Sequence, residues 1–223
     1  MASVADPSDP YLSGILSPQR SALLVVDVQN DFCHEDGLFG KLGMDMGGVQ
    51  SAVRRINALL PVARRSGVPI IFIVMEHDVS TNSRAWINRY PTPRADACVA
   101  GTWGAEFYNV APATGEPVVV KHRYSPFVGT NIEYLLRAKD RKSLIVTGVA
   151  TNICVEAVLR DAFVRDYDVV LVEDCAAAYS EREHQSSIDN TRAFLGRVIT
   201  SKALTEHWSP NAAHRVEFPL HRV

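Results

Sequence analysis

Five runs of consecutive apolar residues most constrain what this chain can fold into. A strand that is apolar at every position, rather than at every second one, is typical of a strand buried on both faces. A shorter sixth run, RVITSKAL (197–204), follows the five longer ones. The five are SALLVVDVQ (21–29), VPIIFIVMEH (68–77), PVVVKHRYS (117–125), SLIVTGV (143–149) and YDVVLVEDC (167–175).

Segments with apolar residues at helical spacing lie between these runs, at 49–67, 131–140, after 149, and at 184–197. Pro61 falls inside the first of them and predicts a kink or a split there. Strands that alternate with helices predict an α/β fold with right-handed crossovers. The expected architecture is a three-layer, doubly wound parallel sheet of the Rossmann or flavodoxin type.

The domain organisation follows from length and composition. Residues 1–20 are rich in proline, serine and aspartate and predict an irregular N-terminal arm. Residues 21–223 are enough for a single domain. Segment 78–116 interrupts the alternation of strands and helices, and so long an insertion is typically functional. It contains the aromatic residues Trp86, Tyr90, Trp103, Phe107 and Tyr108.

The composition excludes several classes of function. The chain is 47% hydrophobic and 22% charged, with a net charge of −2, which argues against a nucleic-acid groove or a polybasic membrane patch. No apolar run approaches the roughly 18 residues that a membrane span needs. The start, MASVADPSDP, lacks the basic and apolar regions of a signal peptide. Four widely spaced cysteines indicate reduced thiols and a cytoplasmic protein.

Three strand ends carry reactive groups. Asp27 ends the first run, Lys121 ends the third, and Cys154 follows the fourth. Ligands of open α/β sheets bind beyond the carboxyl ends of the strands, so these groups are expected at one edge of the sheet. Each alone has an ordinary role, in a turn, in solvent or in the core. Together they favour an active site, because a buried lysine and aspartate are costly unless paired.

The residues after the fourth run predict how Cys154 is presented. Thr151 and Asn152 are good N-cap residues for a following helix. Cys154 then lies in the first turn, where the helix dipole favours a thiolate and free backbone N–H groups can hold an oxyanion. The expected buried stripe of this helix consists of Val155, Val158, Leu159, Ala162 and Phe163.

Three motifs carry a family resemblance: ALLVVDVQNDF (22–32), VVVKHRYSPF (118–127) and VTGVATNICVEAVLRDAF (146–163). In order and spacing the chain resembles the isochorismatase-like cysteine hydrolase superfamily across residues 21–200. Among its branches the motifs look most like amidases of the ureidoacrylate and carbamoyl-amide type. The resemblance implies a Rossmann- or flavodoxin-like sheet and an Asp–Lys–Cys triad. It also implies a cis peptide between Val149 and Ala150.

The resemblance and the chemistry together imply hydrolysis through a thioester acyl-enzyme. Asp27 would take the thiol proton, Lys121 would stabilise the charges, and Cys154 would attack the carbonyl carbon. The oxyanion would rest on the N–H groups of Ala150 and Cys154. A cis peptide before Ala150 would turn its N–H into the site, which would justify a cost of roughly 3 kcal/mol.

The substrate pocket is less constrained by the sequence. Arg123 lies two residues after Lys121, and on a strand this spacing puts both on one face. Arg123 is therefore expected either to reach a substrate carboxylate or to serve on the surface or in an interface. Cys33, Cys98 and Cys175 are expected to pack in the core. The other candidate pocket residues are Phe32, Trp103, Tyr124 and Phe127, together with Asn30, Asp31 and His77 at strand ends.

Two branches of the superfamily fit less well. True isochorismatases resemble this fold but lack the nucleophilic cysteine. Nicotinamidases place an Asp-x-His metal site after the second strand, where this chain reads MEHDVS (75–80). Glu76, His77 and Asp78 are potential ligands, but the spacing to a later histidine is missing. We therefore expect no metal and no cofactor.

The preferred interpretation is a cysteine-dependent amidohydrolase acting on a small linear amide or a carbamoyl or ureido compound, a C–N hydrolase outside the peptidases. The alternatives are a lactam or cyclic-amide hydrolase, a nicotinamidase-like enzyme, and a non-catalytic oligomeric α/β scaffold. The expected partner is a small-molecule amide, without nucleic acid or membrane. A homodimer or homotetramer is expected, with an interface at the aromatic insertion or at the helices flanking 149–163. A monomer whose insertion closes over its own pocket is the alternative.

Overall fold

The computed structural model describes residues 9–90 and 96–209. Its centre is a six-stranded parallel sheet in the order β3-β2-β1-β4-β5-β6, so the predicted doubly wound fold is confirmed. From β1 the sheet continues through β2 to β3 on one side and through β4 and β5 to β6 on the other. The strands are β1 (Ser21–Val26), β2 (Ile70–Met75), β3 (Val118–Lys121), β4 (Ser143–Val149), β5 (Asp168–Ala177) and β6 (Arg197–Ile199).

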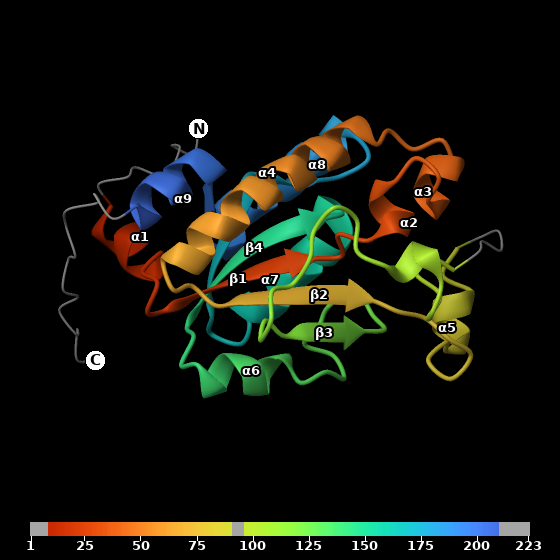
Figure 1. Cartoon of the computed structure of the whole chain (residues 1–223), viewed down its shortest axis with the longest axis horizontal. Helices are drawn as coiled ribbons and strands as arrows, with labels where there is room; N and C mark the ends of the chain where they lie inside the picture. Colours follow the sequence, from red (N-terminus) through yellow and green to blue (C-terminus); the bar gives the residue numbers. More distant parts are fainter. Residues whose placement is uncertain (1–8, 91–95, 210–223) are drawn as a thin grey trace.

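Helices cover both sides of the sheet (Figure 1). In that view α4 and α9 lie on one side of the strands and α6 lies on the other. The described helices are α1 (Pro10–Ile15), α2 (Asn30–Cys33), α3 (Leu38–Lys41), α4 (Gly47–Arg65), α5 (Arg84–Ile87), the 3-10 turn η1 (Trp103–Ala105), α6 (Ile132–Ala138), the π-helical turn η2 (Thr151–Val155), α7 (Glu156–Phe163), α8 (Glu181–Asn190), the π-helical turn η3 (Thr191–Leu195) and α9 (Ser201–Trp208). None of these helices combines the length and apolarity that crossing a bilayer requires.

The strand arrows in Figure 1 all point toward the end of the molecule that holds α2, α3 and α5. The carboxyl ends of β1 and β4 approach each other very closely there. Val26 is in register with Gly148, and a Cβ on Gly148 would stand 2.0 Å from the carbonyl oxygen of Val26. Gly148 also has φ 119°, a conformation that only glycine adopts freely. This glycine therefore lets the turn after β4 lie against the end of β1.

Not every strand is buried on both faces. All residues of β1, β2 and β4 are buried, as their apolar runs predict. The prediction is wrong for β3, where Val118 is 42% and Val120 is 38% exposed. The reason is its position, because β3 is an edge strand whose outer face is open to solvent. Lys121, on the opposite face, is fully buried.

Three element predictions need correction. Helix α4 runs without interruption through Pro61, which therefore does not split it. The run 197–204 is a strand only as far as Ile199, because the side chain of Thr200 accepts the N–H of Ala203 and starts α9. The expected arm is helical over Pro10–Ile15, where Leu12 and Ile15 join the core. Residues 1–8 of that arm, and 210–223 of the expected domain, lie outside the described residues.

Candidate active site

The structure brings the three predicted catalytic side chains together at the carboxyl ends of the strands. The Nζ atom of Lys121 lies 2.8 Å from Oδ2 of Asp27 and 3.5 Å from Sγ of Cys154. Asp27 and Lys121 are fully buried, and Cys154 is 5% exposed. Asp27 has φ 53°, a left-handed conformation that is costly for a residue with a side chain and is found mostly at functional sites.

The charges of this site are coupled. Burial raises the pKa of Asp27, and the ammonium of Lys121 opposes that shift. Burial is the largest single effect on the pKa of Lys121 and acts to lower it, but the charges and hydrogen bonds of Asp27 and Cys154 together outweigh burial and raise the pKa. Burial and the charge of Asp27 raise the pKa of Cys154, against the opposing effect of Lys121. The free enzyme therefore holds a protonated thiol at neutral pH, beside the hydrogen-bonded pair of Asp27 and Lys121.

This protonation corrects the expectation that the start of the helix favours a thiolate. Desolvation and the nearby carboxylate dominate, because Cys154 is almost completely buried. Oδ1 of Asp27 is buried and has no hydrogen-bond partner among the described residues. It is thus a free acceptor next to a thiol that must lose its proton.

The turn that carries Cys154 also differs from the expected helix start. Ala150 occupies the N-cap position, and its carbonyl accepts the N–H groups of Ile153 and Val155 at 3.1 and 3.2 Å, which makes the turn π-helical. Thr151 does not cap it, because its hydroxyl is 2.8 Å from Nδ1 of His184. Asn152 makes no side-chain cap either. The peptide bond between Val149 and Ala150 is cis, at the position that the resemblance implies.

A small, mostly apolar pocket adjoins the thiol. Its volume is about 60 Å³, which is room for a few waters or a small organic molecule. Both Asp27 and Cys154 contribute to its surface. The lining residues are Asp27, Phe32, Leu38, Phe39, Leu42, Met75, His77, Trp86, Arg89, Tyr90, Ala97, Tyr124, Val149, Ala150, Ile153, Cys154 and Tyr179.

Three of the predicted pocket residues, Phe32, His77 and Tyr124, line this pocket. His77 is 2% exposed, and within the described part of the chain neither of its ring nitrogens has a hydrogen-bond partner. Burial lowers the pKa of His77 to about 4, so its ring is neutral at neutral pH. The ring centroid lies 4.7 Å from that of Trp86. The two ring nitrogens are therefore available to hydrogen-bond a ligand or a water in the pocket.

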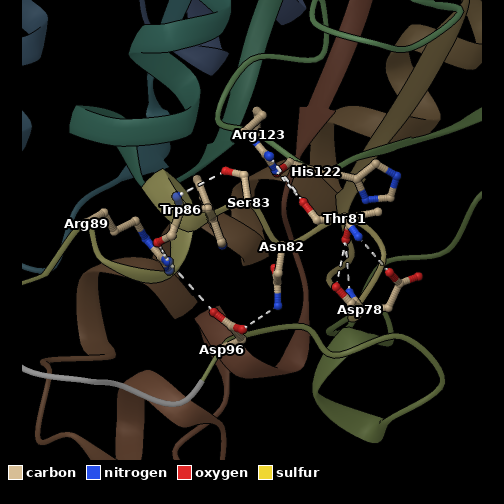
Figure 2. Close-up of polar contacts among 9 residues, drawn as sticks. All are labelled: Asp78, Thr81, Asn82, Ser83, Trp86, Arg89, Asp96, His122 and Arg123. Atoms are coloured by element: carbon tan, nitrogen blue, oxygen red, sulfur yellow. Dashed lines mark hydrogen bonds and ion pairs between the residues drawn. The ribbon is translucent and has the colours of Figure 1, made fainter.

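Four predicted pocket residues lie elsewhere. Asn30 donates its side-chain amide to the carbonyl of Trp103 at 2.8 Å. Trp103 itself is 46% exposed. Phe127 packs in the core against Tyr167, with 6.0 Å between ring centroids. The fourth, Arg123, donates from both terminal nitrogens to the carbonyl of Thr81, at 3.1 Å each, as Figure 2 shows.

Asp31 has a structural role. Its two carboxylate oxygens accept the N–H of Leu38 at 3.0 Å and that of Cys98 at 2.7 Å. A Cβ on Gly104 would stand 2.2 Å from the same carboxylate. Asp31 thereby ties the insertion to the segment that follows β1. Cys33, Cys98 and Cys175 are fully buried, as their assignment to packing predicts.

Several lining residues were missed by sequence reasoning. Trp86, Arg89, Tyr90 and Ala97 come from the insertion, which was predicted to be functional only as a whole. Tyr179 follows β5, and its hydroxyl donates to the carbonyl of Phe32 at 3.1 Å. No periodic pattern in these segments distinguishes a pocket residue from a neighbour. The aromatic content of the insertion was the one usable signal.

A metal site is not formed by the expected candidates. Within residues 9–90 and 96–209, no three His, Cys, Asp or Glu side chains are grouped so that they could hold a metal ion. His77 faces the pocket, whereas Asp78 accepts the N–H groups of Ser80 and Thr81.

We predict that activity needs no metal, because the nucleophile is a thiol and the donor set is incomplete. Treatment with EDTA followed by desalting is expected to leave the rate unchanged, and elemental analysis to find no stoichiometric zinc. Loss of activity in the chelator, with recovery on adding zinc, would refute this.

Comparison with known proteins places the chain in a family. Residues 21–203 match the model of the isochorismatase domain. The chain belongs to the isochorismatase family. A curated family relative, a ureidoacrylate amidohydrolase from Variovorax paradoxus, is 32% identical over 214 residues, covering 89% of this chain and 85% of the relative.

Solved structures of the family agree in fold. A cysteine hydrolase from Pseudomonas syringae has a TM-score of 0.74 and 25% identity, covering 86% of this chain and 93% of its own. The N-carbamoylsarcosine amidase from Thermoplasma acidophilum has a TM-score of 0.66 and 27% identity, covering 82% and 96%. These matches confirm the family resemblance that the three sequence motifs carry.

Proposed function

We propose that this protein is a cysteine-dependent amidohydrolase that cleaves a C–N bond of a small ureido or carbamoyl compound. The observation that carries the proposal is the thiol of Cys154, 3.5 Å from the ammonium of a buried Lys121–Asp27 pair, at the surface of a small pocket. Two relatives named above support it, because one is a ureidoacrylate amidohydrolase and the other an N-carbamoylsarcosine amidase.

The geometry supplies each chemical step. Oδ1 of Asp27, free of other partners, accepts the thiol proton as Sγ of Cys154 bonds to the carbonyl carbon. Lys121 stabilises both negative groups throughout. The C–N bond then breaks, and the proton moves from Asp27 to the departing nitrogen. Asp27 next takes a proton from water, whose oxygen attacks the thioester, and the proton returns to the sulfur as the thiol leaves.

The transition state needs donors for the developing oxyanion. We assign this role to the N–H groups of Ala150 and Cys154, which belong to residues that line the pocket beside the sulfur. Such donors are typically worth 10²–10³-fold in rate. A non-catalytic scaffold accounts poorly for the site, since a buried ion pair is seldom more stabilising than apolar residues of the same size.

A screen of candidate amides tests the proposed function. Purified protein is supplied with ureido acids, carbamoyl amino acids, linear amides, lactams and nicotinamide, and released ammonia or ring-opened product is measured. The highest kcat/KM is expected for a ureido or carbamoyl compound. A clear preference for a lactam or for nicotinamide would instead favour the corresponding alternative enzyme.

We further propose that the protein works in the cytoplasm as a homo-oligomer. Within the insertion Trp86 is buried and Phe107 packs against the core, although Val79, Ile87, Val99 and Trp103 are exposed. We favour the second candidate, beside α7, where Phe163, Val164 and Phe194 are 46%, 70% and 72% exposed and the two phenylalanines line one surface hollow. Phe163 is thus not in the buried stripe predicted for its helix.

Assembly is predicted to bury this surface beside α7. Light scattering during size-exclusion chromatography is expected to give at least twice the chain mass of 24.6 kDa. Phe194→Ser is expected to shift the protein toward the monomer, whereas Val79→Ser, at an exposed residue of the insertion, is expected to leave the assembly unchanged. A monomeric wild-type protein at micromolar concentration would refute the oligomer.

A further inference from the structure

Arg89 brings a cation into the wall of the pocket that holds the thiol. Its guanidinium stacks on aromatic rings, with Cζ 3.9 Å from the ring centroid of Trp86 and 4.7 Å from that of Tyr90. Nη1 donates to the carbonyl of Trp86 at 2.5 Å. Nε is buried and has no hydrogen-bond partner among the described residues. The group is therefore oriented, but its hydrogen-bonding capacity is not used up.

The carboxylate of Asp96 pairs only loosely with Arg89. Oδ1 of Asp96 is 3.8 Å from Nη1, beyond hydrogen-bond distance. Figure 2 shows that the other oxygen of Asp96 faces Asn82, whose amide donates to it at 2.9 Å. Asp96 itself does not line the pocket. Arg89 thus has a loose counter-charge on one side and the pocket on the other.

Arg123 contrasts with Arg89. Its terminal nitrogens are occupied by the carbonyl of Thr81, and Nη1 also donates to the carbonyl of His122 at 2.5 Å. In Figure 2 it reaches the loop that holds Thr81, on the other side of Trp86 from the Arg89–Asp96 pair. Arg123 therefore holds a loop with three of its hydrogen bonds, and it is not among the residues that line the pocket.

The other charges and polar groups of the pocket favour an anionic ligand. Asp27 is neutralised by Lys121 at 2.8 Å, so that pair adds no net charge. His77, with both buried ring nitrogens unpartnered, offers a donor and an acceptor to an uncharged polar group. Among the described residues that line the pocket, Arg89 is therefore a charged group with an N–H donor still unpaired. A planar guanidinium matches the geometry of a carboxylate best.

We propose that Arg89 binds a carboxylate of the substrate, so that the enzyme selects small acids that carry a ureido or carbamoyl group. This inference rests on the proposed function as far as the reaction is concerned. The binding of the acid by Arg89 can be true whether or not that reaction occurs. Arg89 sets specificity, and the sulfur, carboxylate and ammonium of the triad perform the chemistry. The stacking on Trp86 and Tyr90 holds the guanidinium in place before substrate arrives.

The kinetic test compares 3-ureidopropionate with N-propylurea, which lacks the carboxylate. The wild-type kcat/KM is expected to favour the acid by at least about 10²-fold, since a site built for a polar group rejects an analogue without it. Arg89→Gln is expected to remove most of this preference, mainly by raising KM for the acid, and to lower kcat/KM for N-propylurea far less than kcat/KM for the acid. Arg89→Lys should recover part of it, and Arg123→Gln, the matched control, should keep it.

A binding measurement separates this inference from the proposed reaction. Calorimetry on Cys154→Ala protein is expected to detect 3-ureidopropionate, and the added change Arg89→Gln is expected to abolish binding. Binding without turnover by the wild type would refute the reaction but keep the role of Arg89. Equal use of both ureas, an unchanged preference in Arg89→Gln, or no binding of the acid would overturn the inference. Thermal melting of each variant shows that it is folded.

Discussion

Replacing Cys154 by alanine is expected to abolish amide hydrolysis while the protein stays folded. The variant lacks the sulfur that forms the thioester, and loss of a nucleophile typically costs at least about 10⁴-fold in kcat. The fold should tolerate the change, because alanine removes one atom from a side chain beside the pocket. Cys154→Ser is expected to be equally inactive, since a hydroxyl loses its proton much less readily than a thiol and is the weaker nucleophile. Ammonia release and circular dichroism measure the two properties.

The other cysteines provide matched controls. Cys33→Ala and Cys175→Ala remove equally buried thiols that do not line the pocket, and their activity is expected to persist. Iodoacetamide is expected to inactivate the wild type at the same rate as it labels Cys154. Bound substrate is expected to slow both the labelling and the inactivation. Near wild-type turnover by Cys154→Ala would contradict the assignment of the nucleophile.

Asp27→Asn is expected to be as damaging as the loss of the thiol. An amide keeps the shape of the carboxylate but cannot accept the proton of Cys154 or pass it to the leaving nitrogen. Removal of a general acid–base usually costs ~10²-fold or more, and here one group serves both half-reactions. The variant also leaves the ammonium of Lys121 buried without its counter-charge, so lower stability is expected too.

Lys121→Ala tests the same site through the pH dependence of kcat/KM. Lys121 lowers the pKa of both Asp27 and Cys154, so its removal raises both. Ionised Asp27 then requires a higher pH, and the acid limb of the kcat/KM profile is expected to move in the alkaline direction while the maximum falls. Thermal melting separates a folded, slow variant from an unfolded one. If either variant keeps more than about a tenth of the wild-type rate, its assigned role is wrong.

The triad was predictable because its positions follow from topology. Parallel strands end at one edge, so Asp27, Lys121 and Cys154 converge whatever the details of the loops. Arg123 shows where this reasoning stops. Its expected direction assumed that β3 continues past Lys121, but the strand ends at that residue. Beyond the last ladder hydrogen bond, the alternation of side chains no longer holds.

The insertion shows a second limit. Trp86 and Arg89 lie in a segment without helical or strand periodicity, and their places depend on distant contacts such as Asp31 with Cys98. Phe163 shows a third, because an apolar residue at the end of α7 has the same spacing whether it faces the core or the outside. Local pattern identifies an apolar face but not what covers it.

The insertion is attached to the ends of the sheet strands by two short β-bridges, Gln29 with Phe107 and His77 with Val99. The ends of the sheet strands and the turn after β4 carry Asp27, Lys121 and Cys154. In the sequence, Trp86 and Arg89 lie between the two bridged residues His77 and Val99. If Arg89 selects the substrate as proposed, part of the specificity is encoded in a segment that holds none of the three proposed catalytic residues. Redesign of 78–98 alone offers a route to new substrates that leaves the bond-breaking apparatus intact.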